Sequence, residues 1–267
     1  MSFVNVEYPR EGICLVTLNR PERMNAMAFD VMVPFKEALE EVGFNNDIRA
    51  VVITGAGDGF CAGADLEDPG WLDMFNGLTV PGIARRAMRV LEDVVRTINN
   101  LPQPVIGAIN GAAIGGGFCL AMATDIRVAS EKAYFRPAGI NNGLTSAELG
   151  LSYLLPRAIG TSRAFEIMLT GRDVDAMEAA NLGIVSRCVH PDQLLEECYS
   201  IAERIAGFSQ LGVEMSKQML WAGVDAGSLN THMNHEGHAQ LFVRMTTKNF
   251  EEAIRARKEE RKPDFKD

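Results

Sequence analysis

Short apolar runs recur through the first two-thirds of the chain, and polar or glycine-containing segments separate them. Runs of this length that are rich in Val and Ile predict buried β-strands, because β-branched side chains pack well on a pleated surface. Five segments fit this description: Ile13–Leu18, Ile48–Thr54, Val105–Ile109, Ile126–Ala129 and Ile184–Val189.

Between the predicted strands, apolar residues recur at the three- and four-residue spacing of an amphipathic helix. Asp175 followed by Glu178 is similar to the capping box that begins a short helix, and Gly183 is placed to end it. Strands that alternate with helices predict α/β layering. Two further helical stripes are Phe35, Ala38, Leu39 and Val42, and Ala84, Met88, Leu91, Val95 and Ile98.

After about His190 the strand patterns stop and helical spacing continues. We therefore expect an α/β core over residues 1–195 and a helical region over residues 196–267. The helical region either covers a neighbouring subunit or folds back on its own core, and the sequence leaves both open. The apolar helical patterns after His190 are Leu194, Leu195, Cys198, Ile201 and Ile205, then Val213–Trp221 and Gln240–Arg257.

Composition narrows the class of protein. Apolar residues make up 47% of the 267 residues, which is enough for a sizeable core, and the formal charge of -9 argues against binding to nucleic acid or to an anionic membrane. No apolar run reaches membrane-spanning length. The five cysteines form no CxxC pair, so a disulfide framework is not expected and a reducing, cytoplasmic location fits best.

Three segments that each follow a predicted strand carry candidate chemistry. Residues 19–26 form an Asn- and Pro-containing turn with two arginines that can meet phosphates. Residues 55–66 and 110–122 are rich in glycine, which lets a ligand approach backbone N–H groups, and the second enters a helix whose dipole favours negative charge. Each segment taken alone also has a purely structural explanation. Residues 19–26 fit an exposed turn, residues 55–66 a loose glycine loop, and residues 110–122 a close-packed helix start. Neither glycine segment matches the dinucleotide or phosphate-loop fingerprint.

The order and spacing of the three segments resemble the crotonase (enoyl-CoA hydratase/isomerase) family. The most specific marks are residues 60–66 and 110–117, and the resemblance extends to residues 253–263 near the end of the chain. It implies a spiral of strand–strand–helix (ββα) units, a C-terminal helical trimerisation region, and a homotrimer or a dimer of trimers. The implied substrate is an acyl-CoA or enoyl-CoA thioester of fatty-acid metabolism, so coenzyme A arrives with the substrate and no separate cofactor is expected.

The same resemblance implies an oxyanion hole made by the backbone N–H groups of Ala64 and Gly116. Two fixed donors stabilise the charge that develops on a thioester oxygen when an enolate forms, and losing one such donor costs about 3–4 kcal/mol of barrier. The residues implied to bind coenzyme A are Ala62, Asp65 and Leu66 around the adenine, and Arg23 and Ala26 near the pantetheine and phosphates.

The chain departs from the family pattern at the acid–base positions. Family hydratases use two glutamates to activate water, and here Cys119 and Gly139 stand at those positions. Glu148 matches the place where the family's dienoyl-CoA isomerases and chlorobenzoyl-CoA dehalogenases carry a catalytic aspartate. Apolar neighbours would raise its pKa and suit it to proton transfer, whereas an exposed glutamate in a helix's first turn is the alternative. Residues 142–150 hold one residue more than the family's usual spacing.

These replacements leave the reaction open. One carboxylate can move a proton between carbons, whereas hydration must also deprotonate a water, so both hydration and isomerisation remain candidates. The alternative is a catalytically inactive acyl-CoA-binding or regulatory protein. Cys119 is expected to be a small buried apolar residue, because the sequence places no base or cation beside it.

Two other features invite functional interpretations. His232, His235 and His238 drift around a helix without an HExxH pattern, so no metal site is expected. Residues 67–86 are predicted to be a mobile loop. Its large side chains either line an acyl pocket or pack against the core: Trp71, Met74 and Phe75.

Overall fold

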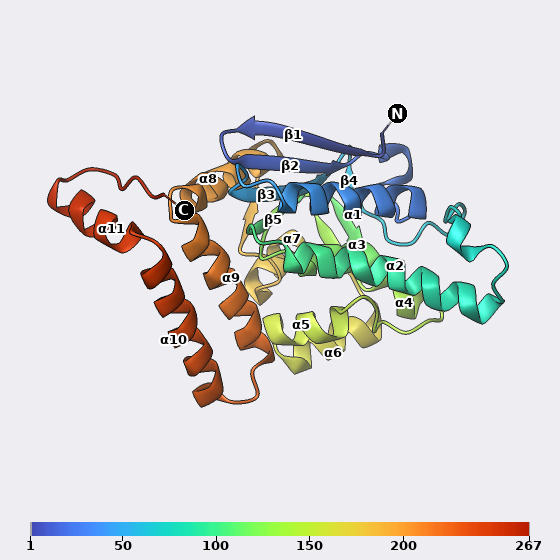
Figure 1. Ribbon diagram of the computed structural model, residues 1–267. Coiled ribbons are helices and arrows are strands. Elements are labelled where there is room, and N and C mark those ends of the chain that lie inside the picture. Colours follow the sequence, from blue (N-terminus) through green and yellow to red (C-terminus); the bar gives the residue numbers. More distant parts are fainter. Residues whose placement is uncertain (1, 267) are drawn as a thin grey trace.

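Two β-sheets form the centre of the computed structural model, which describes residues 2–266 (Figure 1). The large sheet contains, in spatial order, β1 (Val4–Arg10), β2 (Ile13–Leu18), β3 (Ala50–Gly55), β5 (Val105–Ile109), β7 (Ile126–Ser130) and β10 (Arg187–Val189). The small sheet contains β4 (Gly59–Cys61), β6 (Ala112–Ile114), β8 (Tyr134–Arg136) and β9 (Val174–Asp175). Strands β2, β3, β5, β7 and β10 are parallel to one another, while β1 pairs with β2 antiparallel.

The chain winds as a spiral in which one strand joins each sheet in turn. Strand β3 leads to β4, β5 to β6 and β7 to β8, and a helix follows each pair: α2 (Val80–Asn100), α3 (Gly116–Ala123) and α4 (Ala138–Asn141). This arrangement confirms the predicted α/β spiral of ββα units. The strands of the small sheet are only two or three residues long, so they carry too few residues for an alternating pattern to be visible in the sequence.

The longer predicted strands lie where the apolar runs placed them, with differences at their ends. Strands β2 and β5 match the prediction, β3 begins two residues late and β7 ends one residue late. Strand β10 begins at Arg187 rather than Ile184, because the N–H groups of Ile184 and Val185 bond to the carbonyl of Ala179 and close the end of helix α7 (Ala176–Leu182).

The predicted helix signals are confirmed in α1 (Phe29–Gly43), α2 and α7. The Asp175 side chain accepts a hydrogen bond from the Glu178 N–H at 2.8 Å, and Gly183 ends α7 in a left-handed conformation with φ 90°. Helix α2 begins at Val80, so residues 80–86 of the predicted loop are helical. Pro81 does not prevent this, because the first turn of a helix has no use for its missing N–H.

Small helices cover the lower part of the spiral in the view of Figure 1: α5 (Leu151–Ile159) and α6 (Thr161–Thr170). Helix α8 (Leu194–Ala206) packs against the large sheet through Leu194, Cys198 and Ala202. The predicted boundary between residues 195 and 196 falls within α8, and the division into two parts remains a prediction.

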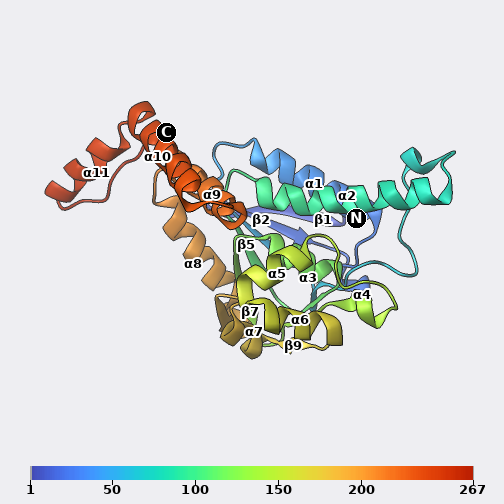
Figure 2. The same cartoon turned by 90° about the horizontal axis from the view of Figure 1, so that it is seen from below.

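Helix α9 (Gln210–Asp225) lies against the core, where Lys217 and Trp221 both bond to Asp125. Helices α10 (Leu229–Thr246) and α11 (Asn249–Lys258) extend away from the sheets in both views (Figures 1 and 2). The helix predicted over Gln240–Arg257 is interrupted because Thr247 adopts an extended conformation at the end of α10. Helices α10 and α11 leave several apolar side chains exposed: Leu229, Met233, Leu241, Phe242, Met245, Phe250 and Ile254.

Candidate active site

Two glycine-containing turns lie side by side at one edge of the small sheet. Strands β4 and β6 are parallel neighbours, and each runs directly into its turn. A Cβ atom on Gly63 would lie 2.6 Å from the Ile114 carbonyl oxygen and 3.3 Å from the Gly116 nitrogen. A Cβ atom on Gly117 would lie 2.0 Å from the Cys61 carbonyl oxygen. Glycine is therefore required at both positions for the turns to approach this closely.

The Ala64 N–H direction is fixed through its own peptide plane. The Gly63 carbonyl accepts a hydrogen bond from the Met27 N–H at 2.7 Å. Because a trans peptide is planar, the Ala64 N–H points opposite to that carbonyl and away from Met27. Within residues 2–266, no acceptor is bonded to the Ala64 N–H. The group is therefore available to a ligand.

The Gly116 N–H is oriented in a similar way. The Gly115 carbonyl accepts the Cys119 N–H at 3.1 Å, so it points along helix α3 and the Gly116 N–H points outward from the helix start. The helix dipole places positive charge at this end. The part of the chain that the structure describes supplies no acceptor for the Gly116 N–H either.

Glu148 lies beside the second turn. Its Oε1 is 3.5 Å from the position that a Cβ would take on Gly115. The residue precedes α5 and is partly buried, so it is not the solvent-facing first-turn glutamate that the sequence left as an alternative. Desolvation by burial raises the pKa of the Glu148 carboxyl. The next residue, Leu149, has a left-handed φ of 45°, which is costly for a branched side chain.

Positions 119 and 139, where the resemblance leads us to expect glutamate in a hydratase, offer no second acid. Cys119 is fully buried, and its thiol donates to the Gly115 carbonyl at 3.2 Å. Burial raises the pKa of the Cys119 thiol well above its usual value, with the Glu148 charge adding to this, so the residue is a buried apolar group. A Cβ on Gly139 would lie 2.0 Å from the Thr145 carbonyl oxygen, so the following loop occupies the space that a side chain would need.

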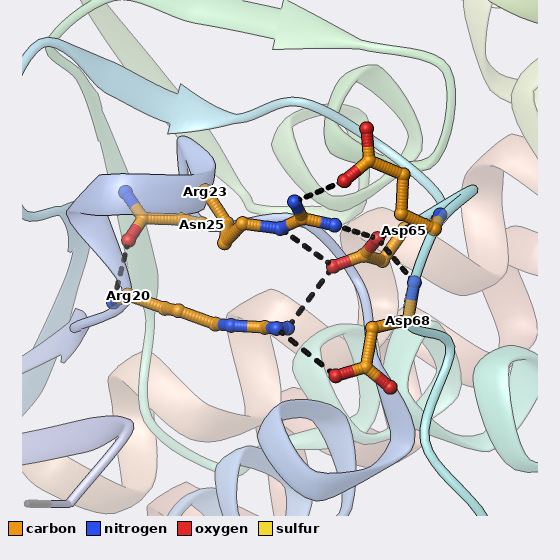
Figure 3. Close-up of polar contacts among 6 residues, drawn as sticks. Arg20, Arg23, Asn25, Asp65 and Asp68 are labelled. Carbon is orange, nitrogen blue, oxygen red and sulfur yellow. Dashed lines mark hydrogen bonds and ion pairs between the residues drawn. The ribbon is translucent and has the colours of Figure 1, made fainter.

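A cluster of opposite charges joins the turn at residues 20–23 to residues 65–68, which follow the Gly63 turn (Figure 3). Arg23 Nη2 lies 2.6 Å from Asp65 Oδ1, and Arg20 Nη1 lies 3.1 Å from Asp65 Oδ2. Asp68 lies 3.8 Å from Arg20, and Glu67 pairs with Arg23. Hydrogen bonds from Arg23, followed by those from two backbone amides, hold the pKa of the Asp65 carboxyl well below its usual range.

The residues expected to bind coenzyme A lie on these two adjoining segments. Ala62 donates its N–H to the Met24 carbonyl at 3.0 Å, and Met27 pairs with Ala64 in a parallel bridge. Leu66 is 79% exposed, whereas the Asp65 side chain is buried. Ala26 is buried.

Sequence reasoning missed the structural role of Asn25. Its Oδ1 accepts the Arg20 N–H at 2.9 Å, while its Nδ2 donates to the carbonyls of Ala56 at 3.0 Å and Gly59 at 2.8 Å. Asn25 also has a left-handed φ of 55°, which asparagine tolerates better than most residues. An asparagine in a turn was the available signal, but its partners more than thirty residues away were not visible in the sequence.

The large side chains of residues 67–79 have different environments. Phe75 is 1% exposed and packs edge-on against Phe29 and Trp71, with ring centroids 5.2 and 5.4 Å apart. Trp71 and Met74 are more than half exposed. Phe75 therefore packs in a small aromatic cluster, whereas Trp71 and Met74 offer accessible apolar surface.

Between Ser2 and Lys266, no helix combines the length and apolar character needed to cross a membrane. Over the same residues, no group of three or more His, Cys, Asp or Glu side chains is placed to hold a metal ion. His232 instead lies 3.4 Å from Glu236 on the same helix.

The ββα spiral with paired glycine turns defines an α/β protein of the crotonase fold, and the comparisons with known proteins agree. The model of the enoyl-CoA hydratase/isomerase family matches residues 9–267, and the chain belongs to this family. It is an enzyme that acts on coenzyme A thioesters.

The relatives include one that is named a hydratase and one that is named an isomerase. A protein of Mycobacterium tuberculosis named "Probable enoyl-CoA hydratase" is 62% identical over 267 residues, which cover 100% of this chain and 94% of the relative. The 1,2-epoxyphenylacetyl-CoA isomerase of Escherichia coli is 31% identical, with 99% and 98% covered.

Two solved structures are also similar to this chain. A probable enoyl-CoA hydratase/isomerase of Mycobacterium abscessus is 63% identical with a TM-score of 0.95, and 99% of each chain is covered. A monofunctional enoyl-CoA isomerase of Mycobacterium smegmatis is 55% identical with a TM-score of 0.75, covering 87% of this chain and 99% of that one.

Proposed function

We propose that the enzyme moves a carbon–carbon double bond within enoyl-CoA thioesters, with Glu148 as the single acid–base group. The observation that carries this proposal is the position of one desolvated carboxylate beside the turn that contains the Gly116 N–H. The N–H groups of Ala64 and Gly116 are the proposed oxyanion hole, and their lack of acceptors among residues 2–266 supports that role.

The proposed reaction needs one proton to leave and one to return. The Glu148 carboxylate removes a proton from C2 of a 3-enoyl-CoA, and the electrons move toward the thioester oxygen to give a dienolate. The two N–H groups stabilise the negative oxygen without reorganising, which is worth about 3–4 kcal/mol for each donor. Protonated Glu148 then delivers the proton to C4, which gives the 2-enoyl-CoA and restores the carboxylate.

Hydration is the second candidate, and the name of the relative from Mycobacterium tuberculosis favours it. Adding water requires a base for the water and an acid for carbon. Cys119 and Gly139 supply neither, because the thiol is buried with a raised pKa and position 139 has no space for a side chain. The name of the 55% identical protein from Mycobacterium smegmatis supports isomerisation.

The test is a panel of 2-enoyl-CoA and 3-enoyl-CoA thioesters incubated with the enzyme in D2O or in ¹⁸O-labelled water. Mass spectrometry and chromatography then separate the two reactions. A moved double bond is expected, with deuterium uptake only to the extent that the proton on Glu148 exchanges with the solvent before it returns to carbon. Incorporated ¹⁸O without double-bond movement would instead establish hydration, and tight acyl-CoA binding with no product would favour the non-catalytic alternative.

For the coenzyme A portion we propose the backbone around Ala62, Asp65 and Leu66 as the adenine site, with Ala26 and Arg23 nearer the pantetheine and phosphates. The parallel bridge between Met27 and Ala64 supports this, because it brings the two segments together. No separate cofactor is part of the proposal.

We also propose that the chain assembles as a homotrimer or a dimer of trimers. The exposed apolar side chains of α10 and α11 support this, because a large exposed apolar surface marks an interface. Light scattering during gel filtration would measure the mass of the assembly. A cytoplasmic location and a role in fatty-acid metabolism complete the proposal, and the five free cysteines support the location.

A further inference from the structure

The Ala64 N–H depends on how segment 63–65 is held against Met27. Two backbone hydrogen bonds connect them: Met27 N–H to the Gly63 carbonyl at 2.7 Å, and Asp65 N–H to the Met27 carbonyl at 3.4 Å. The second bond is long and therefore weak. Backbone bonding alone leaves the downstream side of Ala64 poorly fixed.

The Asp65 side chain supplies the missing restraint. Its carboxylate is 2% exposed and lies 2.6 Å from Arg23 Nη2 and 3.1 Å from Arg20 Nη1 (Figure 3). Both arginines belong to the turn that leads to Met27, so these ion pairs hold the two segments together. The same carboxylate accepts the N–H groups of Glu67 at 3.0 Å and Asp68 at 2.9 Å, which fixes the chain beyond Ala64.

The arginines are themselves held in place. The Arg20 side chain is 9% exposed, and its guanidinium lies 5.5 Å from the centre of the Phe3 ring. The Arg20 N–H donates to Asn25 Oδ1, so the arginine is fixed at its backbone and at its tip. The contacts of Arg20 therefore form a rigid support on which Asp65 is placed.

We propose that Asp65 is a positioning residue, which through Arg20 and Arg23 holds the Ala64 N–H at the place where the thioester oxygen becomes negative. This inference rests on the proposed oxyanion hole. The stabilisation of the transition state is sensitive to donor placement, because a displacement of about 1 Å can cost about 100-fold in rate. Substrate binding depends on many contacts and is less sensitive.

The experiment compares Asp65→Asn and Arg23→Gln with the wild-type enzyme. The probe is butanoyl-CoA labelled with ¹³C at the thioester carbonyl, and infrared difference spectra are recorded at saturating ligand. In the wild-type enzyme, hydrogen bonds to the oxygen lower the carbonyl stretching frequency. We expect a smaller shift in Asp65→Asn and an intermediate shift in Arg23→Gln. The kcat for 3-enoyl-CoA falls in the same order, by up to about 100-fold, while the KM of Asp65→Asn changes less than its kcat.

The chain offers a matched control in Glu252. This buried carboxylate also pairs with two arginines, Arg255 and Arg261, and accepts a backbone N–H from Asp264 at 2.9 Å. It lies on α11, at the end of the molecule away from the sheets (Figure 1). Glu252→Gln should lower Tm as Asp65→Asn does, but leave the carbonyl shift at its wild-type value.

The outcomes separate this inference from the proposed function. A folded Asp65→Asn variant with a wild-type carbonyl shift and wild-type kcat would overturn the positioning role alone. If Asp65→Asn fails to fold, a wild-type shift in Arg23→Gln overturns it instead. A wild-type enzyme that shows no carbonyl shift would overturn the oxyanion hole itself, and the positioning role with it.

Discussion

The Glu148 Oε1 lies 3.5 Å from the position of a Cβ on Gly115, the residue directly before the Gly116 N–H. The proposed acid–base group and one proposed oxyanion donor are therefore held by neighbouring main chain. Four predictions test the arrangement.

Glu148→Gln should abolish most of the isomerase activity while acyl-CoA still binds. General acid–base groups contribute about 100-fold to 10,000-fold to a rate, so kcat should fall within that range. Initial rates with 3-enoyl-CoA and calorimetric titration with butanoyl-CoA measure the two quantities. A rate equal to that of the wild type would rule out Glu148 as the acid–base group.

The same substitution should raise stability at neutral pH. Burial raises the pKa of Glu148, so the unfolded chain ionises this group at a lower pH than the folded one does. Wild-type stability therefore falls as pH rises from the ordinary glutamate range through the raised pKa, and glutamine removes this loss. Thermal denaturation across pH 4 to about 8 should show the greatest advantage of Glu148→Gln at the upper end. An advantage confined to acid pH would contradict the assignment.

Gly139→Ala should destabilise the protein, because the new Cβ would lie 2.0 Å from the Thr145 carbonyl oxygen. Overpacking of this kind costs about 1–3 kcal/mol or more, measured by urea unfolding. Gly237→Ala in α10 is the control, since nothing lies within 4 Å of its Cβ position and alanine favours a helix by up to about 1 kcal/mol. By the same reasoning, Gly139→Glu should not create a hydratase. Equal stability of Gly139→Ala and wild type would show that the loop moves freely.

Cys119 should resist alkylation in the folded protein. Burial raises the pKa of its thiol, and the side chain is inaccessible. Cys188 is the only cysteine in the described chain that is not fully buried, so it should react first with iodoacetamide. Peptide mass spectrometry before and after denaturation measures both sites. Cys119→Ala should retain isomerase activity, and its complete loss would assign the thiol a direct role.

The sequence predicted the glycine turns because close approach of two backbones restricts the residue type. Gly63 and Gly117 each face a carbonyl oxygen across the junction of β4 and β6, and no other residue fits there. Strands β2, β3 and β5 were predicted for a related reason, since a strand buried on both faces must be apolar throughout. Strand β1, which is the longest strand of the described chain, was not predicted, because most of its residues are exposed and it carries no continuous apolar run. A feature can be predicted from the sequence where its geometry permits only one class of residue.

Other features depend on the path of distant segments, and the sequence does not show that path. The obstruction at Gly139 comes from the carbonyl of Thr145, and a backbone atom carries no side-chain signature. Several arginines in the sequence have the right charge to pair with Asp65. The bridge between Met27 and Ala64 selects Arg20 and Arg23, because it brings their turn beside Asp65. The break between α10 and α11 depends on the conformation of Thr247, a residue that also occurs within helices.

The donors proposed for the negative oxygen belong to the main chain, and this has an evolutionary consequence. No point mutation can delete the N–H of Ala64 or Gly116, except one to proline, so this part of the machinery persists while side chains around it change. Carboxylates can then be lost at positions 119 and 139 and kept at 148 without rebuilding the enolate-stabilising part. A scaffold of this kind lets descendants change the reaction by altering the side chains and loops around fixed main-chain donors.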